Sequence, residues 1–316
     1  MHSGDAIGPL GRGEPITIRQ TIERIPSWAS ASSAAITPLP GGITNANYRV
    51  DVDGESFVVR IPADNAAMLG IDRHREYQCT MAAGRSGVAP EVVAFLPDVG
   101  VLVTRFVPGR HPTAVEMVTP EMMARVVDSV RAYHEGPAFE GTFSPFRAIE
   151  HYLHTARRHG APLPPDADTL VTRLGAIEAA LSPAGGLIRP CHNDLWDPNL
   201  IDDGTRIRIV DWEYAGMGDA YFDLASFAIH HELSDAQDRA LLRRYFGDVP
   251  AMGVARLELL RAAAELREAM WCMVGMYVSS IEFDFIGYAA THFERYRGAL
   301  ADPRMRDWFA GAAGTR

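Results

Sequence analysis

The chain changes character about one third of the way along its length, and this change limits the possible folds more than any other feature. Between residues 36 and 106, short runs of alternating apolar and polar residues are separated by turn sequences such as Asp53-Gly54. This pattern is typical of antiparallel strands. From residue 120 to 299, apolar residues recur at helical spacing instead. Strands followed by helices predict an α+β fold with two lobes.

The same patterns divide the chain. We expect an N-terminal extension over 1–34, a smaller lobe of strands over 35–107 and a larger, mainly helical lobe over 108–316. In the smaller lobe, the predicted elements are a helix over 72–84 and strands over 36–39, 48–52, 57–61, 91–95 and 100–106. In the larger lobe, the predicted helices cover 120–135, 146–158, 167–181, 221–231, 236–246, 254–280 and 284–299. Short apolar runs at 187–188, 200–201 and 207–210 interrupt the helices, and loops between such runs can present catalytic groups.

Composition excludes several classes of protein. Of the 316 residues, 47% are hydrophobic, which is enough for a packed core and excludes a disordered chain. The net charge of −10 disfavours nucleic acid as a partner, because such binding needs clustered positive charge. All 30 basic residues are arginine and none is lysine. Any chemistry that ordinarily uses a lysine must therefore be done by arginine.

Cysteine usage and hydropathy indicate the compartment. Cys79, Cys191 and Cys272 are far apart and odd in number, so neither a disulfide framework nor a zinc site is indicated. The apolar stretch over 269–281 is shorter than the ~20 residues that span a bilayer. We expect a cytoplasmic protein without membrane insertion, as a monomer or homodimer.

The most specific motif begins at His192. His192, Asp194 and Asn199 have the spacing H-x-D-x-x-x-x-N, and Asp211 follows a short hairpin. This is the catalytic arrangement of protein-kinase-like phosphotransferases, and we expect His192 and Asp194 in the catalytic set. A carboxylate beside an incoming hydroxyl can orient it and accept its proton, a role we predict for Asp194. Mg²⁺ on the triphosphate of ATP needs hard oxygen ligands, and Asn199 and Asp211 are the candidates.

The predicted strands supply the residues that complement this motif on the nucleotide side of the site. Alternation over 57–61 places Val58 and Arg60 on one face of a strand, where a small apolar residue suits an adenine ring and a cation suits phosphates. Arg60 needs an acidic partner, and Glu76 on the following helix is suitably placed. The turn over 41–47 offers backbone N–H groups that could cap phosphates. Its candidate nucleotide-binding residues are Gly42, Thr44, Asn45 and Asn47.

Taken together, these segments resemble the aminoglycoside phosphotransferase and choline kinase superfamily, and within it most resemble choline/ethanolamine kinases. The resemblance lies in the blocks 41–50, 58–62, 76–90, 192–223 and 279–288, and spans about residues 36–300. It implies a two-lobed protein-kinase-like fold that uses ATP and Mg²⁺. It also implies that 105–107, including Phe106, meets the adenine edge, and that Asp223 braces the catalytic loop.

The substrate side can be argued from cation chemistry. A quaternary ammonium cannot donate N–H hydrogen bonds, so aromatic faces and nearby carboxylates hold it. Trp271 and Tyr288 match the family positions associated with a cation pocket, whereas Glu268 stands where the family has an aromatic residue. The candidate substrate residues are Glu213, Tyr214, Trp271, Glu282 and Tyr288, with Phe285 nearby.

The leading interpretation is therefore a kinase that phosphorylates a small cationic amino alcohol, choline or ethanolamine. An aminoglycoside, thiamine, a sugar or homoserine is an alternative acceptor, and a non-catalytic nucleotide-binding regulator is a further alternative. The adjacent residues His230 and His231 are interpreted as a partly exposed helix face rather than as a metal site, because neighbouring helical side chains point in different directions.

Overall fold

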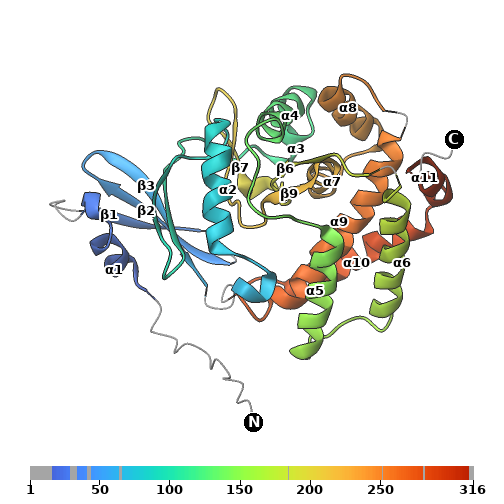
Figure 1. The fold of residues 1–316 in the computed structure, drawn as a ribbon, viewed down its shortest axis with the longest axis horizontal. Coiled ribbons are helices and arrows are strands. Elements are labelled where there is room, and N and C mark those ends of the chain that lie inside the picture. The colour runs from blue at the N-terminus through green and yellow to red at the C-terminus, as the bar shows by residue number, and fades with distance from the viewer. Residues whose placement is uncertain are drawn as a thin grey trace, which may run out of the picture.

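The computed structural model describes residues 16–28, 34–40, 44–63, 66–183, 185–250, 252–279 and 282–312. Figure 1 shows two lobes, with a sheet and one long helix on one side and a larger group of helices on the other. We call them the sheet lobe and the helical lobe. This arrangement is the α+β fold that the sequence predicts.

The sheet lobe is built on antiparallel strands. Within the described residues they form a five-stranded sheet in the order β1-β2-β3-β5-β4. Asp53 and Gly54, with φ of 50° and 82°, make the two-residue turn between β2 and β3, and this turn sets Tyr48 opposite Val59. The strands are β1 (Ala34–Leu39), β2 (Asn45–Val52), β3 (Glu55–Pro62), β4 (Val92–Leu96) and β5 (Val101–Arg105).

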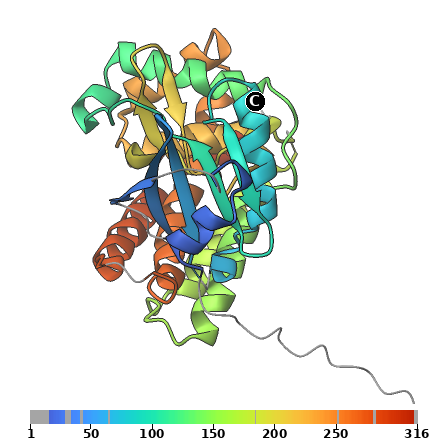
Figure 2. The same cartoon turned by 90° about the vertical axis from the view of Figure 1, so that its left-hand side faces the viewer.

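The two faces of the sheet have different partners. Phe57 and Val59 are buried on one face, where the Trp28 ring lies 5.0 Å from that of Phe57. Trp28 belongs to the short helix η1 (Pro26–Trp28), which follows α1 (Ile18–Glu23), and Figure 2 shows α1 in front of the strands. Part of the predicted N-terminal extension thus joins the core of the sheet lobe. On the other face, Val58 and Arg60 line a cavity between the lobes.

Helix α2 (Arg73–Arg85) connects the sheet to the rest of the molecule. Asp72 caps its N-terminus by accepting hydrogen bonds from the backbone N–H groups of His74 and Arg75. The buried residues Cys79, Ala82 and Ala83 pack into the main core of the helical lobe. The helix therefore holds Glu76 at a fixed place beside the cavity.

The helical lobe surrounds α9 (Gly253–Gly275), most of whose residues are buried. Helices α5 (Pro145–Arg158), α7 (Ala220–His230) and α10 (Phe285–Ala301) pack against it. Among the described residues, the other α-helices of this lobe are α3 (Ala114–Met117), α4 (Pro120–His134), α6 (Ala167–Leu181), α8 (Asp235–Phe246) and α11 (Met305–Ala312).

Two small antiparallel pairs interrupt the helices and carry the catalytic motif. Strand β6 (Ile188–Cys191) pairs with β9 (Gly216–Asp219), and β7 (Leu200–Asp202) pairs with β8 (Ile207–Ile209). The loops that follow β6 and β8 both reach the cavity, where Asp194 and Asp211 line its wall.

Most predicted elements are confirmed, with some differences. The sequence did not predict α3, α11 or β9, because each is short and its apolar residues do not repeat often enough to reveal a period. Helix α9 ends at Gly275, not at residue 280, because the N–H groups of Tyr277 and Val278 bond three residues back and tighten the chain. The division at residues 34 and 107 stays a prediction.

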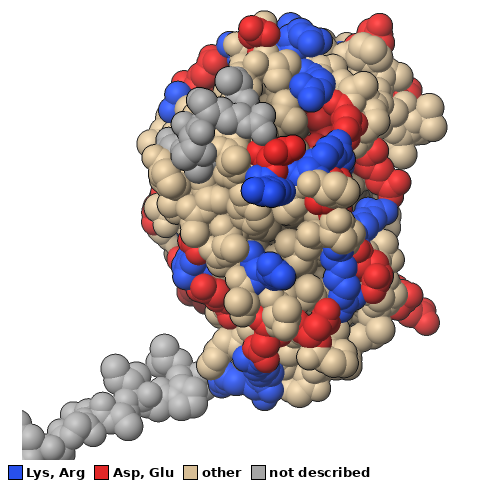
Figure 3. Space-filling view, turned by 90° about the vertical axis from the view of Figure 1, so that its right-hand side faces the viewer, with Lys and Arg blue, Asp and Glu red and all other residues tan. Residues whose placement is uncertain are grey.

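Charged side chains of both signs are mixed on one face of the molecule. On the face in Figure 3, basic side chains lie among acidic ones and form no continuous basic patch in its described part. None of the helices within the described ranges combines the length and apolar character that crossing a bilayer requires.

Candidate active site

A cavity of about 420 Å³ lies between the lobes. The sheet lobe contributes Val58, Arg60 and Leu102 to its wall, and the helical lobe contributes Asp194 and Trp271. The cavity thus has one wall of strands and an opposite wall made from the loops and helices of the other lobe.

Asp223 on α7 fixes the loop that follows β6. Its carboxylate accepts hydrogen bonds from the backbone N–H groups of His192 (2.9 Å) and Asn193 (2.6 Å). It also accepts from the Tyr133 hydroxyl (2.5 Å) and pairs with His134 (2.9 Å). Asn193 has φ of 68°, a left-handed conformation that turns the chain so that Asp194 faces the cavity. Asp223 does not line the cavity, in keeping with a bracing role.

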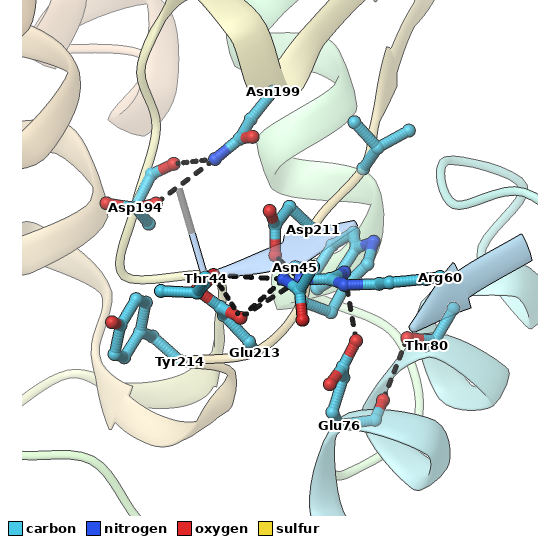
Figure 4. A network of polar contacts seen from close by, with 12 residues as sticks. Thr44, Asn45, Arg60, Glu76, Thr80, Asp194, Asn199, Asp211, Glu213 and Tyr214 are labelled. Carbon is cyan, nitrogen blue, oxygen red and sulfur yellow. Dashed lines mark hydrogen bonds and ion pairs between the residues drawn. The ribbon is translucent and has the colours of Figure 1, made fainter. Parts of the chain in front are cut away.

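Asp194 is held from two sides. Asn199 Nδ2 donates to its Oδ2 (3.1 Å), and Arg267 Nη1 donates to its Oδ1 (3.0 Å). Figure 4 shows the contact between Asp194 and Asn199. Burial raises the pKa of Asp194 above its ordinary value, although the Arg267 guanidinium works against that shift. A carboxylate in this setting has a fixed direction and a strengthened tendency to accept a proton.

Asn199 and Asp211 lie at neighbouring ends of the β7–β8 hairpin. The N–H of Val210 donates to the Asn199 carbonyl (3.0 Å), which brings Asp211 beside Asn199 at the cavity. Burial raises the pKa of Asp211 to about 7, although its contact with Arg60 opposes that shift. Amide and carboxylate oxygens are the donors that Mg²⁺ prefers, so the chemistry of this pair fits that ion.

Arg60 connects the sheet lobe to this loop (Figure 4). Its Nη1 lies 2.9 Å from Glu76 Oε1, and its Nη2 contacts Asp211 and donates to Glu213 Oε2 (3.0 Å). The predicted partner Glu76 is therefore in place. The second arginine of the network, Arg73, donates to Glu76 (2.7 Å) and Glu213 (3.1 Å) and was not identified from the sequence.

Glu213 is the centre of this network. Besides the two arginines, Thr44 Oγ1 (2.9 Å) and Asn45 Nδ2 (3.1 Å) donate to its carboxylate. Burial by itself raises the pKa of Glu213, but Arg60 and Arg73 hold it below its ordinary value. The sequence predicts Glu213 on the substrate side and Thr44 and Asn45 at the nucleotide. The structure brings these three side chains together at the junction of the lobes, where Thr44 and Glu213 also line the cavity.

Of the other predicted nucleotide-binding residues, three line the cavity and one lies outside the described residues. Asn47, Val58 and Phe106 all line the cavity on the side of the sheet lobe, as a binding face for adenine requires. Gly42 lies outside the described residues.

Three of the five predicted substrate residues gather at the helical end of the cavity, whereas Glu213 lies at the junction of the lobes. Tyr214, Trp271 and Tyr288 line it, and Trp271 Nε1 donates to the Tyr214 hydroxyl (2.7 Å). Glu282 is exposed and does not line the cavity. Phe285 packs beneath Trp271 at a ring distance of 6.1 Å.

The structure places His192 and His231 differently from what the sequence predicts. His192 is fully buried below the cavity wall, and its Nε2 donates to the Val210 carbonyl (2.9 Å). It supports the backbone before Asp211 and does not line the cavity. The interpretation of His230 and His231 as a partly exposed face is wrong for His231, which is buried, whereas His230 is half-buried as a residue although its side chain is only 7% exposed. They lie at the end of α7, where α9 and the catalytic loop cover both sides.

The fold and this site together define a two-lobed phosphotransferase of the protein-kinase-like class. Residues 35–257 match the model of the phosphotransferase enzyme family, so the chain belongs to that family.

Solved structures and curated proteins agree with this assignment. A choline/ethanolamine kinase family protein from Mesorhizobium loti has 28% identity and a TM-score of 0.79, with 94% of this chain and 98% of that chain covered. The choline kinase LicA from Streptococcus pneumoniae shares the fold, with 20% identity, a TM-score of 0.76, and 90% and 98% covered. Protein LicA of Haemophilus influenzae is 29% identical over 65% of this chain, and the match spans 61% of that protein's length.

Replacing Glu213 tests its role at the junction of the lobes. Glu213→Gln keeps the shape but leaves Arg60 and Arg73 short of a buried counter-charge, so we expect the free energy of unfolding to fall by about 2–4 kcal/mol. Urea denaturation at pH 7 measures it. Glu282→Gln is the control, because that exposed position should change stability by less than about 0.5 kcal/mol. Equal stability of the two variants would contradict the role.

Replacing Asp223 gives a second test, which depends on pH. Burial alone would raise the pKa of Asp223, but His134 and Tyr133 hold it below its ordinary value. The stability that the ionised group contributes is therefore present above the unfolded pKa of about 3.9 and is lost as pH falls toward the folded pKa. Asp223→Asn should cost about 3 kcal/mol at pH 7, and its difference from the unchanged protein should shrink below about pH 4.

Urea unfolding at pH 7 and pH 3.5 checks this expectation. Glu121→Gln, at an exposed position of α4, is the control for removing one carboxylate. A difference that stays constant with pH would show that Asp223 does not act through its charge.

Proposed function

We propose that the protein transfers the γ-phosphoryl group of ATP to the hydroxyl of a small cationic amino alcohol, of the choline and ethanolamine type. One observation carries the proposal. A single cavity has Asp194, Asn199 and Asp211 on one wall, Arg60 on the opposite wall and aromatic side chains at one end. The names of the similar choline and ethanolamine kinases support the same acceptor class.

In this proposal each wall of the cavity has a separate task. Val58, Phe106 and Asn47 receive the nucleotide base, and Arg60 binds phosphate oxygens from a direction fixed by Glu76. Asn199 and Asp211 would hold Mg²⁺. When bound, ATP supplies the phosphoryl group, and Mg²⁺ neutralises negative charge on the phosphates.

Asp194 orients the hydroxyl of the acceptor and accepts its proton. Asn199 and Arg267 keep the carboxylate pointing into the cavity, so little reorganisation is needed when the acceptor arrives. The faces of Trp271, Tyr214 and Tyr288 attract the cationic end of the acceptor through their π electrons. His192 positions the loop and does not touch the acceptor.

The substitution Asp194→Asn tests the role of Asp194 as the base that accepts the proton of the hydroxyl. The amide keeps the size of the side chain but cannot accept the proton, so the turnover number should fall by about 10²–10⁴-fold. Binding of ATP should stay within about threefold. A coupled ADP-release assay with ethanolamine and choline measures turnover, and calorimetry measures ATP binding. Near-normal turnover in this variant would remove Asp194 from the base role.

The aromatic end is tested by Trp271→Leu. The aliphatic side chain keeps an apolar contact but removes the π face and the hydrogen bond to Tyr214, so the KM of the amino alcohol should rise about tenfold. The KM of ATP should stay unchanged, because Trp271 lies at the other end of the cavity. Trp308→Leu on α11 is a matched control away from the cavity. If KM for ATP rises as much as KM for the acceptor, the cation lies elsewhere.

A further inference from the structure

The inner end of the cavity holds a cluster of acceptor atoms that the mechanism above uses only in part. One oxygen of Asp194, one ring nitrogen of His230 and one oxygen of Glu268 lie within 4.8 Å of one another. They come from the catalytic loop, from the last residue of α7 and from α9. Asp194 and Glu268 line the cavity, so a ligand that enters it can reach the cluster.

His230 gives the cluster an unused hydrogen-bonding atom. Its side chain is more than nine-tenths buried, and its Nε2, 3.9 Å from Glu268 Oε1, has no hydrogen-bond partner among the described residues. Burial lowers the pKa of His230 more than Glu268 and Asp194 raise it, so the ring is neutral near pH 7 and one nitrogen can accept a bond. Buried polar atoms are nearly always satisfied, so an N–H group of a ligand can supply the partner that this nitrogen lacks.

The charges around the cluster leave room for one further positive charge. Arg267 Nη1 donates to Asp194 (3.0 Å) and also pairs with the neighbouring Glu268. With His230 neutral and both carboxylates ionised, the single guanidinium leaves a net charge of −1 among these described residues. A monocation balances this charge, whereas the guanidinium already present disfavours a divalent metal ion at the same carboxylates.

The acceptors lie close enough together for one ammonium nitrogen to contact all three. The three N–H bonds of a primary ammonium point at tetrahedral angles, and acceptors about 2.9 Å from the nitrogen then lie about 4.7 Å apart, which is near the upper limit of the separations in this cluster. A quaternary ammonium has no N–H to donate, so it would leave the nitrogen of His230 unpaired and would add no hydrogen bond to the carboxylates. Leaving buried acceptors unpaired is strongly unfavourable.

Resting on the function proposed above, we propose that Asp194, His230 and Glu268 bind the protonated primary amine of the acceptor. The protein is thereby selective for ethanolamine-like acceptors over choline-like ones. The amine and hydroxyl of a two-carbon amino alcohol are roughly 3–4 Å apart, so Asp194 can contact both ends of such a molecule. His230 and Glu268 are then the specificity-determining residues, and the faces of Trp271 and Tyr288 lie beside the cation that these acceptors hold.

A methylation series tests the proposal in the unchanged protein. The acceptors are ethanolamine, N-methylethanolamine, N,N-dimethylethanolamine and choline, compared by kcat/KM at saturating ATP. Each added methyl removes one N–H donor, so kcat/KM should fall along the series, by at least about 30-fold in total. Equal or greater efficiency with choline overturns the inference while leaving the proposed kinase function intact.

Binding provides a readout that does not depend on turnover. Calorimetry with ethanolamine and with choline, each without nucleotide, should show tighter binding of ethanolamine. If none of the four acceptors is phosphorylated but ethanolamine still binds more tightly, the amine site stands and the proposed function fails. If choline binds as tightly as ethanolamine, the amine site fails whatever the turnover.

Two variants assign the selectivity to residues. Glu268→Gln and His230→Leu should each lower kcat/KM for ethanolamine about 10–100-fold and change that for choline less than threefold. His230→Gln, which keeps an acceptor atom, should recover part of the preference. Glu258→Gln, about 15 Å away along α9, is the control for a lost acid on the same helix. Thermal unfolding confirms that each variant is folded, and an equal loss for both acceptors in Glu268→Gln would show a structural role only.

Discussion

The carboxylate of Glu213 is shared between the two lobes, and the geometry of the cavity depends on that contact. Thr44, Asn45, Arg60 and Arg73 all donate to it from the sheet lobe, while its own backbone follows Asp211 in the helical lobe. Because Asp211 and Glu213 are two residues apart, any shift of the sheet relative to the catalytic loop would stretch several buried charge-assisted bonds at once. The distance across the cavity is therefore fixed by hydrogen bonds and not only by apolar packing.

In the helical lobe, on the opposite wall of the cavity, buried charged groups likewise fix the positions of their neighbours. Asp223 gathers the backbone of the catalytic loop, and Arg267 joins Asp194 to Glu268. Burying charges is unfavourable unless each is paired, so every such group constrains its neighbours. The result is a cavity in which acids of different function are separated by arginines. Arg60 lies between Asp211 and Glu76, and Arg267 lies between Asp194 and Glu268.

The sequence predicts the features that depend on residues close together in the chain. Strand alternation identified the faces of β3, so Phe57 is buried and Arg60 faces the cavity. The spacing from His192 to Asp211 identified the side chains that meet at the hairpin, because the turns between them are short. Arg73 and Arg267 were missed, since the partners that bring them to the site, Glu213 and Asp194, are 140 and 73 positions away and no periodic pattern marks these arginines. That α9 covers His230 likewise depends on tertiary packing. The contacts of Glu213 with the sheet lobe could not be predicted either, because its neighbours in the chain do not indicate them.

The buried position of Arg60 has a chemical consequence. The corresponding strand of a protein kinase carries a lysine, whose amine is a nucleophile when it loses its proton. A guanidinium stays protonated and does not react with electrophiles in this way. Since the chain contains no lysine at all, acetylation, ubiquitination and amine-directed covalent inhibitors have no side chain to modify in this site. Compounds that block it must compete by reversible binding or react with other functional groups.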